Sequence, residues 1–207
     1  MGAKVKEMPV VSKMFCSSTQ VVLVVRTRPR VVGGGGFVVT DLHSQAVVFK
    51  VDGCGVLGKK DQMTVTDADQ TPLLLIRHKG GIVEALSLCK QWRGYTQDYV
   101  GTQKLVFTLK DPKACFANNR PVRVSIEQKD ENIYCKKFWI KGYFQDKECS
   151  IIDSGGDVIA QVGVTNEMKK VENKDLYHVV VKPGIDQAFV VGVIAILDYI
   201  HNGSTRC

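Results

Sequence analysis

Apolar and polar positions alternate in short runs along most of the chain, and Gly, Asp, Asn and Pro separate the runs. Val, Ile, Thr, Phe and Tyr dominate these runs, as is typical of β-strands. Turn residues recur about every eight to fifteen positions, which favours an antiparallel sandwich or barrel over alternating strand and helix units. The pattern predicts strands at Val21–Arg28, Gly36–Asp41, Ala46–Val51, Gln62–Asp67, Pro72–His78, Leu105–Leu109, Val122–Ile126, Lys137–Tyr143, Cys149–Asp153, Val158–Val164 and Tyr177–Val181.

Three of the predicted strand pairs share a pattern in which a strand ends in Asp and a short polar turn leads into the next strand. The three residues are Asp41, Asp67 and Asp153. An Asp at the start of a turn can accept a hydrogen bond from the backbone two residues on. We therefore interpret these carboxylates as structural rather than catalytic. The segment Ile82–Tyr95 is ambiguous, because its pattern fits either a strand or an irregular turn.

The segment Ala188–Leu197 differs from the strands because ten consecutive residues carry no polar side chain. Pro183-Gly184 precedes this run and Asn202-Gly203 follows it, as at the start and end of many helices. Asp186 would suit the positive end of a helix dipole. The pattern therefore predicts a helix over residues 184–201, a length too great for an ordinary strand.

This helix is predicted to lie in the protein interior. A membrane span needs about twenty apolar residues, whereas this run is half that length and is bracketed by Asp186 and Asp198. A helix that is apolar on every face must be covered by other elements. The arrangement that combines this many strands with one such helix is a mainly β, antiparallel barrel, or a wrapped sheet, closed around the helix.

The composition is that of a soluble globular protein, with 44% hydrophobic and 24% charged residues in a chain of 207. The formal net charge is +7, and the excess is uneven along the chain. Residues 1–60 contain nine Lys and Arg against three Asp and Glu, whereas the remainder is nearly balanced. The sequence therefore places the positive charge in the first third.

The candidate binding residues come from this basic first third. Arg26 and Arg28 alternate along a predicted strand and should share one face of the sheet. Together with Arg30, Lys59 and Lys60, they are our candidates for binding an anion such as a lipid headgroup. The alternative is that these charges protect an exposed sheet edge, which the proline after Arg28 also suggests.

The cysteine pattern predicts no metal and no cofactor. The seven cysteines are scattered, and none lies in a CxxC pair or in a cluster with zinc spacing. The first twenty residues contain charged positions and no apolar segment typical of a secretory signal. We therefore expect reduced thiols and a cytoplasmic protein, with a peripheral membrane or nuclear location as open alternatives.

Motifs for other chemistry are weak. Residues 53–58 match GxGxxG, but a predicted strand rather than a helix follows them, which disfavours a dinucleotide site. Residues 136–144 interleave basic and aromatic side chains, yet strand alternation would place Phe138 and Ile140 in the core, so nucleic-acid binding is disfavoured. The four histidines lie in no catalytic signature, which favours a protein without catalytic residues.

Three stretches of the chain resemble the plant LURP-one-related proteins, which belong with the tubby C-terminal-like superfamily. The stretches are Phe37–Asp41 leading into Val47–Gly53, Leu73–Arg77 followed by Ser87-Leu88 and Trp92-Arg93, and Pro183–Phe189 leading into Ile196–Asp198. The resemblance implies a twelve-stranded barrel around a hydrophobic C-terminal helix. It also implies a relation to phosphoinositide-binding, membrane-tethered transcription regulators, to phospholipid scramblases and to plant defence. No binding residue of the tubby lipid site can be matched, so none is transferred.

We expect one barrel domain over residues 15–203, with an N-terminal extension over 1–14 and a short tail over 204–207. The favoured function is a non-catalytic domain that binds phosphoinositide or other membrane headgroups, or a protein partner. The alternative is a hydrolase or a small-molecule-binding protein that uses a pocket at the mouth of the barrel. A central helix that fills the barrel leaves little room for such a pocket.

Overall fold

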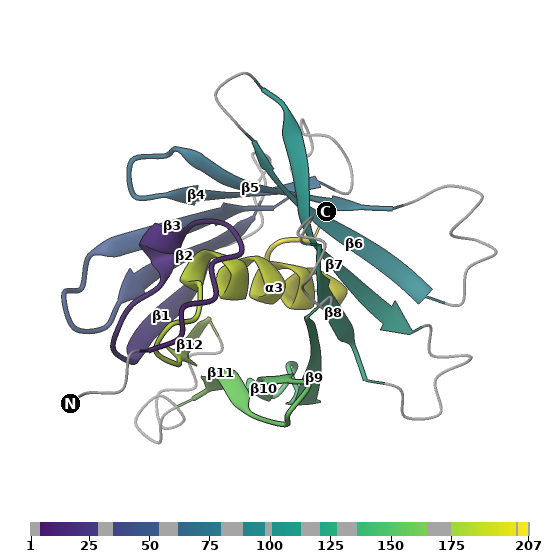
Figure 1. The fold of residues 1–207 in the computed structure, drawn as a ribbon. Coiled ribbons are helices and arrows are strands. Elements are labelled where there is room, and N and C mark those ends of the chain that lie inside the picture. The colour runs from purple at the N-terminus through teal and green to yellow at the C-terminus, as the bar shows by residue number, and fades with distance from the viewer. Residues whose placement is uncertain are drawn as a thin grey trace.

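The computed structural model of the chain describes residues 5–28, 35–53, 62–79, 89–97, 101–112, 121–127, 136–164, 175–201 and 203–206. Twelve antiparallel strands of these residues form a closed barrel around one α-helix (Figure 1). Neighbouring strands follow the order of the sequence, and β1 pairs with β12 to close the barrel. The predicted mainly β barrel around a C-terminal helix is therefore confirmed.

The strands are four to ten residues long, within the usual range for globular proteins. They are β1 (Val21–Arg28), β2 (Gly36–Asp41), β3 (Val47–Asp52), β4 (Gln62–Asp67), β5 (Pro72–His78), β6 (Cys89–Gln97), β7 (Gln103–Pro112), β8 (Arg123–Ile126), β9 (Lys137–Tyr143), β10 (Glu148–Asp153), β11 (Val158–Gly163) and β12 (Leu176–Val181). A 3-10 helix, η1 (Lys13–Phe15), precedes them, and the helix α3 (Gln187–Ile200) follows them. All eleven predicted strands are present; five have the predicted ends, and the other six have at least one end that differs by one to three residues.

The twelfth strand, β6, comes from the segment whose pattern was ambiguous. Its inward positions hold Trp92 and Gly94, which are buried, while Lys90, Gln91 and Arg93 give it a polar sequence. Pairing with β7 along its whole length stabilises it, and this pairing also extends β7 beyond its predicted ends. Tertiary pairing, rather than local propensity, decides the structure here.

The barrel is filled by α3, which Figure 1 shows running through its centre. Eleven consecutive helix residues, Ala188 to Asp198, are buried. Phe189 packs against Phe107 and Phe138, with ring centroids 5.4 and 5.7 Å away. Because inward and outward side chains alternate along each strand, the inner face of the barrel supplies the apolar cover that this helix requires.

The helix begins later than predicted because residues 183–186 form a turn and a cap. Asp186 is the N-cap, and its Oδ1 accepts hydrogen bonds from the backbone N–H groups of Ala188 and Phe189 at 3.0 and 3.2 Å. This geometry satisfies donors that the first helical turn leaves without partners. The predicted position of Asp186 at the positive end of the helix is confirmed.

The same carboxylate also holds the N-terminal segment against the barrel. Its other oxygen, Oδ2, accepts hydrogen bonds from the backbone N–H groups of Val10, Val11 and Ser12 at 2.9, 2.7 and 3.0 Å. Nearby, the backbone N–H of Met8 donates to the carbonyl of Gly184 at 2.7 Å. Residues 8–12 therefore pack against the start of α3 and the turn before it.

A second buried carboxylate holds residues 203–206 at the other end of α3. Asp198 Oδ2 accepts hydrogen bonds from the Thr205 N–H at 2.8 Å, the Thr205 hydroxyl at 3.0 Å and the Ser204 hydroxyl at 3.2 Å. Thr205 is fully buried. Both aspartates that bracket the apolar run are thus structural, each tying a terminal segment to the helix.

The three aspartates at strand ends form the predicted turns. Asp41 Oδ1 accepts from the N–H groups of His43 and Ser44, and Asp153 Oδ1 accepts from two N–H groups of its own turn. Asp67 Oδ1 accepts from the N–H of Thr71 at 2.8 Å. These contacts confirm that the carboxylates stabilise hairpins.

No helix among the described residues is both long enough and apolar enough to cross a lipid bilayer.

Candidate functional site

The two predicted binding residues that the structure describes lie on the outer face of β1, but they differ in environment. Arg26 is exposed. Arg28 is half-buried, and its Nη2 donates to Asp52 Oδ1 at 2.6 Å and to the Val51 carbonyl at 2.8 Å. Lys50 also forms an ion pair with Asp52, at 3.4 Å. The charge of Arg28 is therefore already matched by a neighbouring carboxylate.

The other three candidates, Arg30, Lys59 and Lys60, lie outside the described residues. A binding cluster of all five residues thus stays a prediction. For Arg26 and Arg28, the alternative interpretation that the charges protect an exposed sheet edge is wrong, because β1 has a hydrogen-bonded neighbour on each side of a closed barrel. Arg26 is left as an exposed cation without an ion-pair partner among the described residues.

A stronger concentration of positive charge lies elsewhere on the barrel. Strands β5 to β9 together carry eight Lys and Arg residues and one acidic residue, Asp111. The other seven strands carry three Lys and Arg residues and five acidic ones. The half-buried Asp111 shares the side of β7 that carries the buried Leu109, not the outward side. The outward positions of β5 to β9 therefore include several basic residues and no acidic residue.

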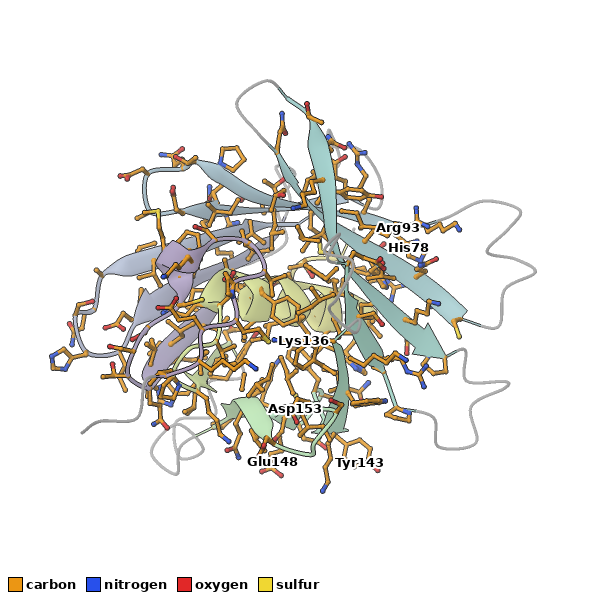
Figure 2. All side chains as sticks on the ribbon, in the orientation of Figure 1. His78, Arg93, Lys136, Tyr143, Glu148 and Asp153 are labelled. Atoms are coloured by element: carbon orange, nitrogen blue, oxygen red, sulfur yellow. The ribbon has the colours of Figure 1, made fainter. Side chains whose placement is uncertain are left out.

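The barrel places like charges directly opposite each other on this surface. Arg77 of β5 pairs with Arg93 of β6, and Lys110 of β7 pairs with Arg123 of β8. Of these four residues, Arg93 is labelled in Figure 2. Directly opposite side chains have Cβ atoms about 5 Å apart, so like charges there are destabilising. None of the four side chains forms an ion pair with a described residue. With Lys137 of β9, these residues make up a surface that we call the basic face.

An aromatic side chain lies within the basic face. Trp139 is half-buried on the outward side of β9 and pairs directly with Arg123 across the sheet. On the same strand, Phe138 and Ile140 point into the core, which confirms the alternation predicted from the sequence. An indole beside cations is typical of surfaces that meet the interfacial region of a membrane. The nearest acid after β8, Glu127, accepts a hydrogen bond from Thr108 at 3.3 Å.

Sequence reasoning missed the basic face because its residues are scattered over 60 positions, from Arg77 to Lys137. Residues 77–137 carry twelve Lys and Arg against six Asp and Glu, but a charge count over all of residues 61–207 hides this excess behind the acidic remainder. A signal was nevertheless present in the strand positions, because each of these five neighbouring strands carries at least one basic residue at an outward position. Only the pairing order of β5 to β9 converts this signal into a surface.

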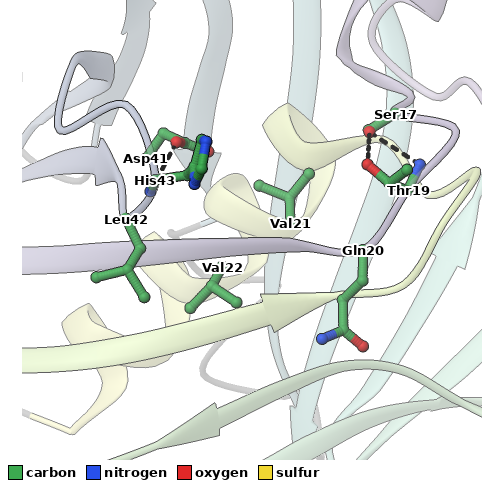
Figure 3. A pocket seen from close by; sticks show the side chains of 8 residues that line it. All are labelled: Ser17, Thr19, Gln20, Val21, Val22, Asp41, Leu42 and His43. Carbon is green, nitrogen blue, oxygen red and sulfur yellow. Dashed lines mark hydrogen bonds between the residues drawn. The ribbon is translucent and has the colours of Figure 1, made fainter.

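A pocket with a volume of about 670 Å³ lies near the start of β1 and the end of β2 (Figure 3). Its Ser17 hydroxyl lies 3.2 Å from the Thr19 hydroxyl, and Asp41 accepts bonds from its own turn. No hydroxyl among its lining residues, all of which are described, is hydrogen-bonded to the His43 imidazole. This pocket therefore lacks the paired hydroxyl and imidazole that activate a nucleophile.

A cluster of titratable side chains lies at the C-terminal end of α3. Lys147 Nζ sits 4.1 Å from the ring centre of Phe144 and 4.4 Å from that of Tyr177, and burial lowers the pKa of this lysine. Burial also raises the pKa of Tyr177 well above its usual value and that of Cys149 to about 11. A thiol with this pKa is protonated at neutral pH and is a poor nucleophile. Among the described residues, no three His, Cys, Asp or Glu side chains are arranged to hold a metal ion.

The histidine in this cluster predicts a dependence of stability on pH. Burial is the main cause that lowers the pKa of His201 below 6.5, against opposing effects of Asp111 and Asp198. As the pH falls below 6.5, the unfolded chain takes up a proton that the folded chain does not, so the free energy of unfolding decreases. Urea unfolding at a series of pH values should show this decrease, and His201→Gln should reduce its slope. The exposed His43→Gln is the control, and an equal effect of both substitutions would contradict the assignment.

The fold defines a class of protein, a closed β-barrel of twelve strands filled by one hydrophobic helix. The family profile described as LURP-one-related matches residues 21–198, from the first strand to the last turns of α3. The chain belongs to the LURP-one-related family, as the resemblance suggested.

Curated relatives of the chain come from Arabidopsis thaliana. Protein LURP-one-related 6 is 53% identical over 199 residues, which cover 96% of this chain and 98% of the relative. Protein LURP-one-related 16 is 48% identical and is covered over the full length of both chains. Protein LURP-one-related 5 is 27% identical over 86% of this chain and 82% of its own length. No solved structure gives a significant match.

Proposed function

We propose that this LURP-one-related barrel is a non-catalytic domain that docks on anionic membrane headgroups through the basic face. The observation that carries the proposal is the pair of like-charge contacts, Arg77 with Arg93 and Lys110 with Arg123. Such pairs cost stability in the free protein. An anionic surface would offset that cost, because each cation near it contributes about 1 kcal/mol.

The five charges of the basic face support docking that is moderate in strength and sensitive to salt. Screening over about 10 Å at 0.1 M ionic strength weakens such contacts strongly. Trp139 supplies an apolar anchor at the level of the headgroups. The absence of ion-pair partners for the basic face among the described residues leaves its charge available to a ligand.

Sedimentation with vesicles of phosphatidylcholine, with and without phosphatidylserine or a phosphoinositide, tests this proposal. We expect binding only to the anionic vesicles, and Arg123→Glu should weaken it roughly thirtyfold, since reversal of one charge changes the binding free energy by about 2 kcal/mol. The double variant Lys110→Glu/Arg123→Glu should abolish measurable binding. Raising the salt concentration should also weaken binding to the anionic vesicles.

The matched control is Arg26→Glu, which makes the same change in net charge on an exposed position outside the basic face. We expect this variant to bind nearly as well as the wild type. An equal loss in both single variants would favour the basic first third, or net charge alone, over the basic face. Binding that ignores lipid charge and salt would contradict membrane docking altogether.

A further inference from the structure

A groove on the outer surface adjoins the basic face and has the features of a binding site for a small molecule. It has a volume of about 310 Å³ and is formed by residues of β4, β5, β6 and β7. This volume lies at the lower end of the range for small-molecule sites. No acidic residue lines the groove, and its lining includes Gln62, Thr64, Leu73, Leu75, Arg77 and Gln103.

The only charged group in the lining, Arg77, is held in a fixed position. Its Nη1 donates to Gln103 Oε1 at 3.0 Å, and its Nε donates to Gln62 Oε1 at 3.4 Å. The guanidinium carbon also lies 5.8 Å from the ring centre of Tyr95. Two neutral amides and an aromatic ring thus orient the guanidinium without neutralising it, so a ligand would meet a preorganised cation.

The chemistry of these contacts fixes which atoms remain for a ligand. A guanidinium is only a donor, so Gln62 and Gln103 must present their amide oxygens to Arg77. Their NH₂ groups are then turned away from the guanidinium and remain as donors. Together with the second terminal nitrogen of Arg77 and the Thr64 hydroxyl, they form a set of donors suited to an acceptor with several oxygens.

A second cation strengthens this preference. Arg93 lies directly opposite Arg77 on the neighbouring strand, and its Nε is buried without a hydrogen-bond partner among the described residues. Neither guanidinium forms an ion pair with a described residue, so the two together create a positive potential at the groove. The side chains of Leu73 and Leu75 are half-buried in the same lining and offer an apolar surface beside the donors.

We infer that this groove binds a small amphipathic anion, with its carboxylate or phosphate head on Arg77, Gln62 and Gln103 and its apolar part on Leu73 and Leu75. The head group has only acceptor oxygens, which match the donors of the site, and a bidentate contact with an arginine fork is available to both anions. The molecule can come free from solution or as part of a lipid. The groove shares Arg77 with the basic face, but binding of a small anion there does not require docking on a membrane and can be tested without one.

Titration of the ¹⁵N-labelled full chain with octanoate, octyl phosphate and octanol, followed by NMR, tests the inference without any membrane. We expect both anions to shift the Arg77 Nε–H and the side-chain amide signals of Gln62 and Gln103, whereas octanol should not. Arg77→Gln should weaken binding by about tenfold or more, because it removes a charge-assisted contact. Arg123→Gln, on the basic face but outside the groove lining, should change the affinity by less than about twofold.

Several results would overturn the inference. They are octanol binding as tightly as octanoate, wild-type affinity in a folded Arg77→Gln variant, or no shift with millimolar octanoate. Vesicles that contain phosphatidic acid distinguish the two sources of the ligand. If lipids supply the head group, octanoate should compete with these vesicles for the protein. If the ligand is a free molecule, added octanoate should leave vesicle binding unaffected. If the protein binds octanoate but does not bind anionic vesicles, the result would contradict the proposed function and leave this inference intact.

Discussion

Replacing Asp186 with alanine should destabilise the protein by about 3–5 kcal/mol, measured by urea unfolding. The fully buried carboxylate accepts five backbone hydrogen bonds, two from the start of α3 and three from residues 10–12. Removing it leaves these donors without partners, and each buried donor left unsatisfied costs about 1–3 kcal/mol where water cannot replace the lost acceptor. The loss should include release of the N-terminal segment, visible as faster hydrogen exchange at Val10 and Val11.

The control for this result is Asp41→Ala. The Asp41 carboxylate also accepts several hydrogen bonds, from His43 and Ser44, but in an exposed turn where water replaces the lost acceptor. We expect a loss of about 1 kcal/mol there. Asp186→Asn should lie between the two, because its amide retains one acceptor oxygen but brings an NH₂ group against N–H donors. Equal losses for Asp41→Ala and Asp186→Ala would contradict a special role for the buried carboxylate.

The fold was largely predictable because its main signals are local. Alternation along a strand and a run of ten apolar residues do not depend on the partner that covers them. The role of Asp186 at the positive end of the helix was predictable for the same reason. Its second role, binding residues 10–12, was not, because it depends on a contact between segments about 175 positions apart.

The candidate site was much less predictable. The charge count of the sequence pointed to Arg26 and Arg28, but a register contact neutralises Arg28 with Asp52. The basic face and the groove at Arg77 depend on which residues lie opposite each other in neighbouring strands. Registers are set by the packing of whole strands against α3, so a single sequence contains this information only indirectly.

The packing of α3 against the barrel wall leads to a second large effect on stability. Phe189→Ala should reduce the free energy of unfolding by about 3–5 kcal/mol, the usual range for removing a buried phenyl ring. Phe189 is fully buried and contacts the rings of Phe107 and Phe138, so its loss leaves a cavity between the helix and two strands. These residues lie on three separate elements, none of which can move freely in a closed barrel to fill the space.

The same reasoning predicts how the loss depends on the replacement. Phe189→Leu keeps most of the volume and should cost less than about 1.5 kcal/mol, whereas Leu42→Ala, at a position that is 47% exposed, should change stability by less than about 0.5 kcal/mol. Chemical denaturation of the three variants under one set of conditions gives the comparison. A loss near 1 kcal/mol for Phe189→Ala would mean that the ring is not enclosed on all sides. The helix would then not be the filled centre around which the strands close. The expected order of losses, in which Phe189→Ala is by far the largest of the three, would be wrong.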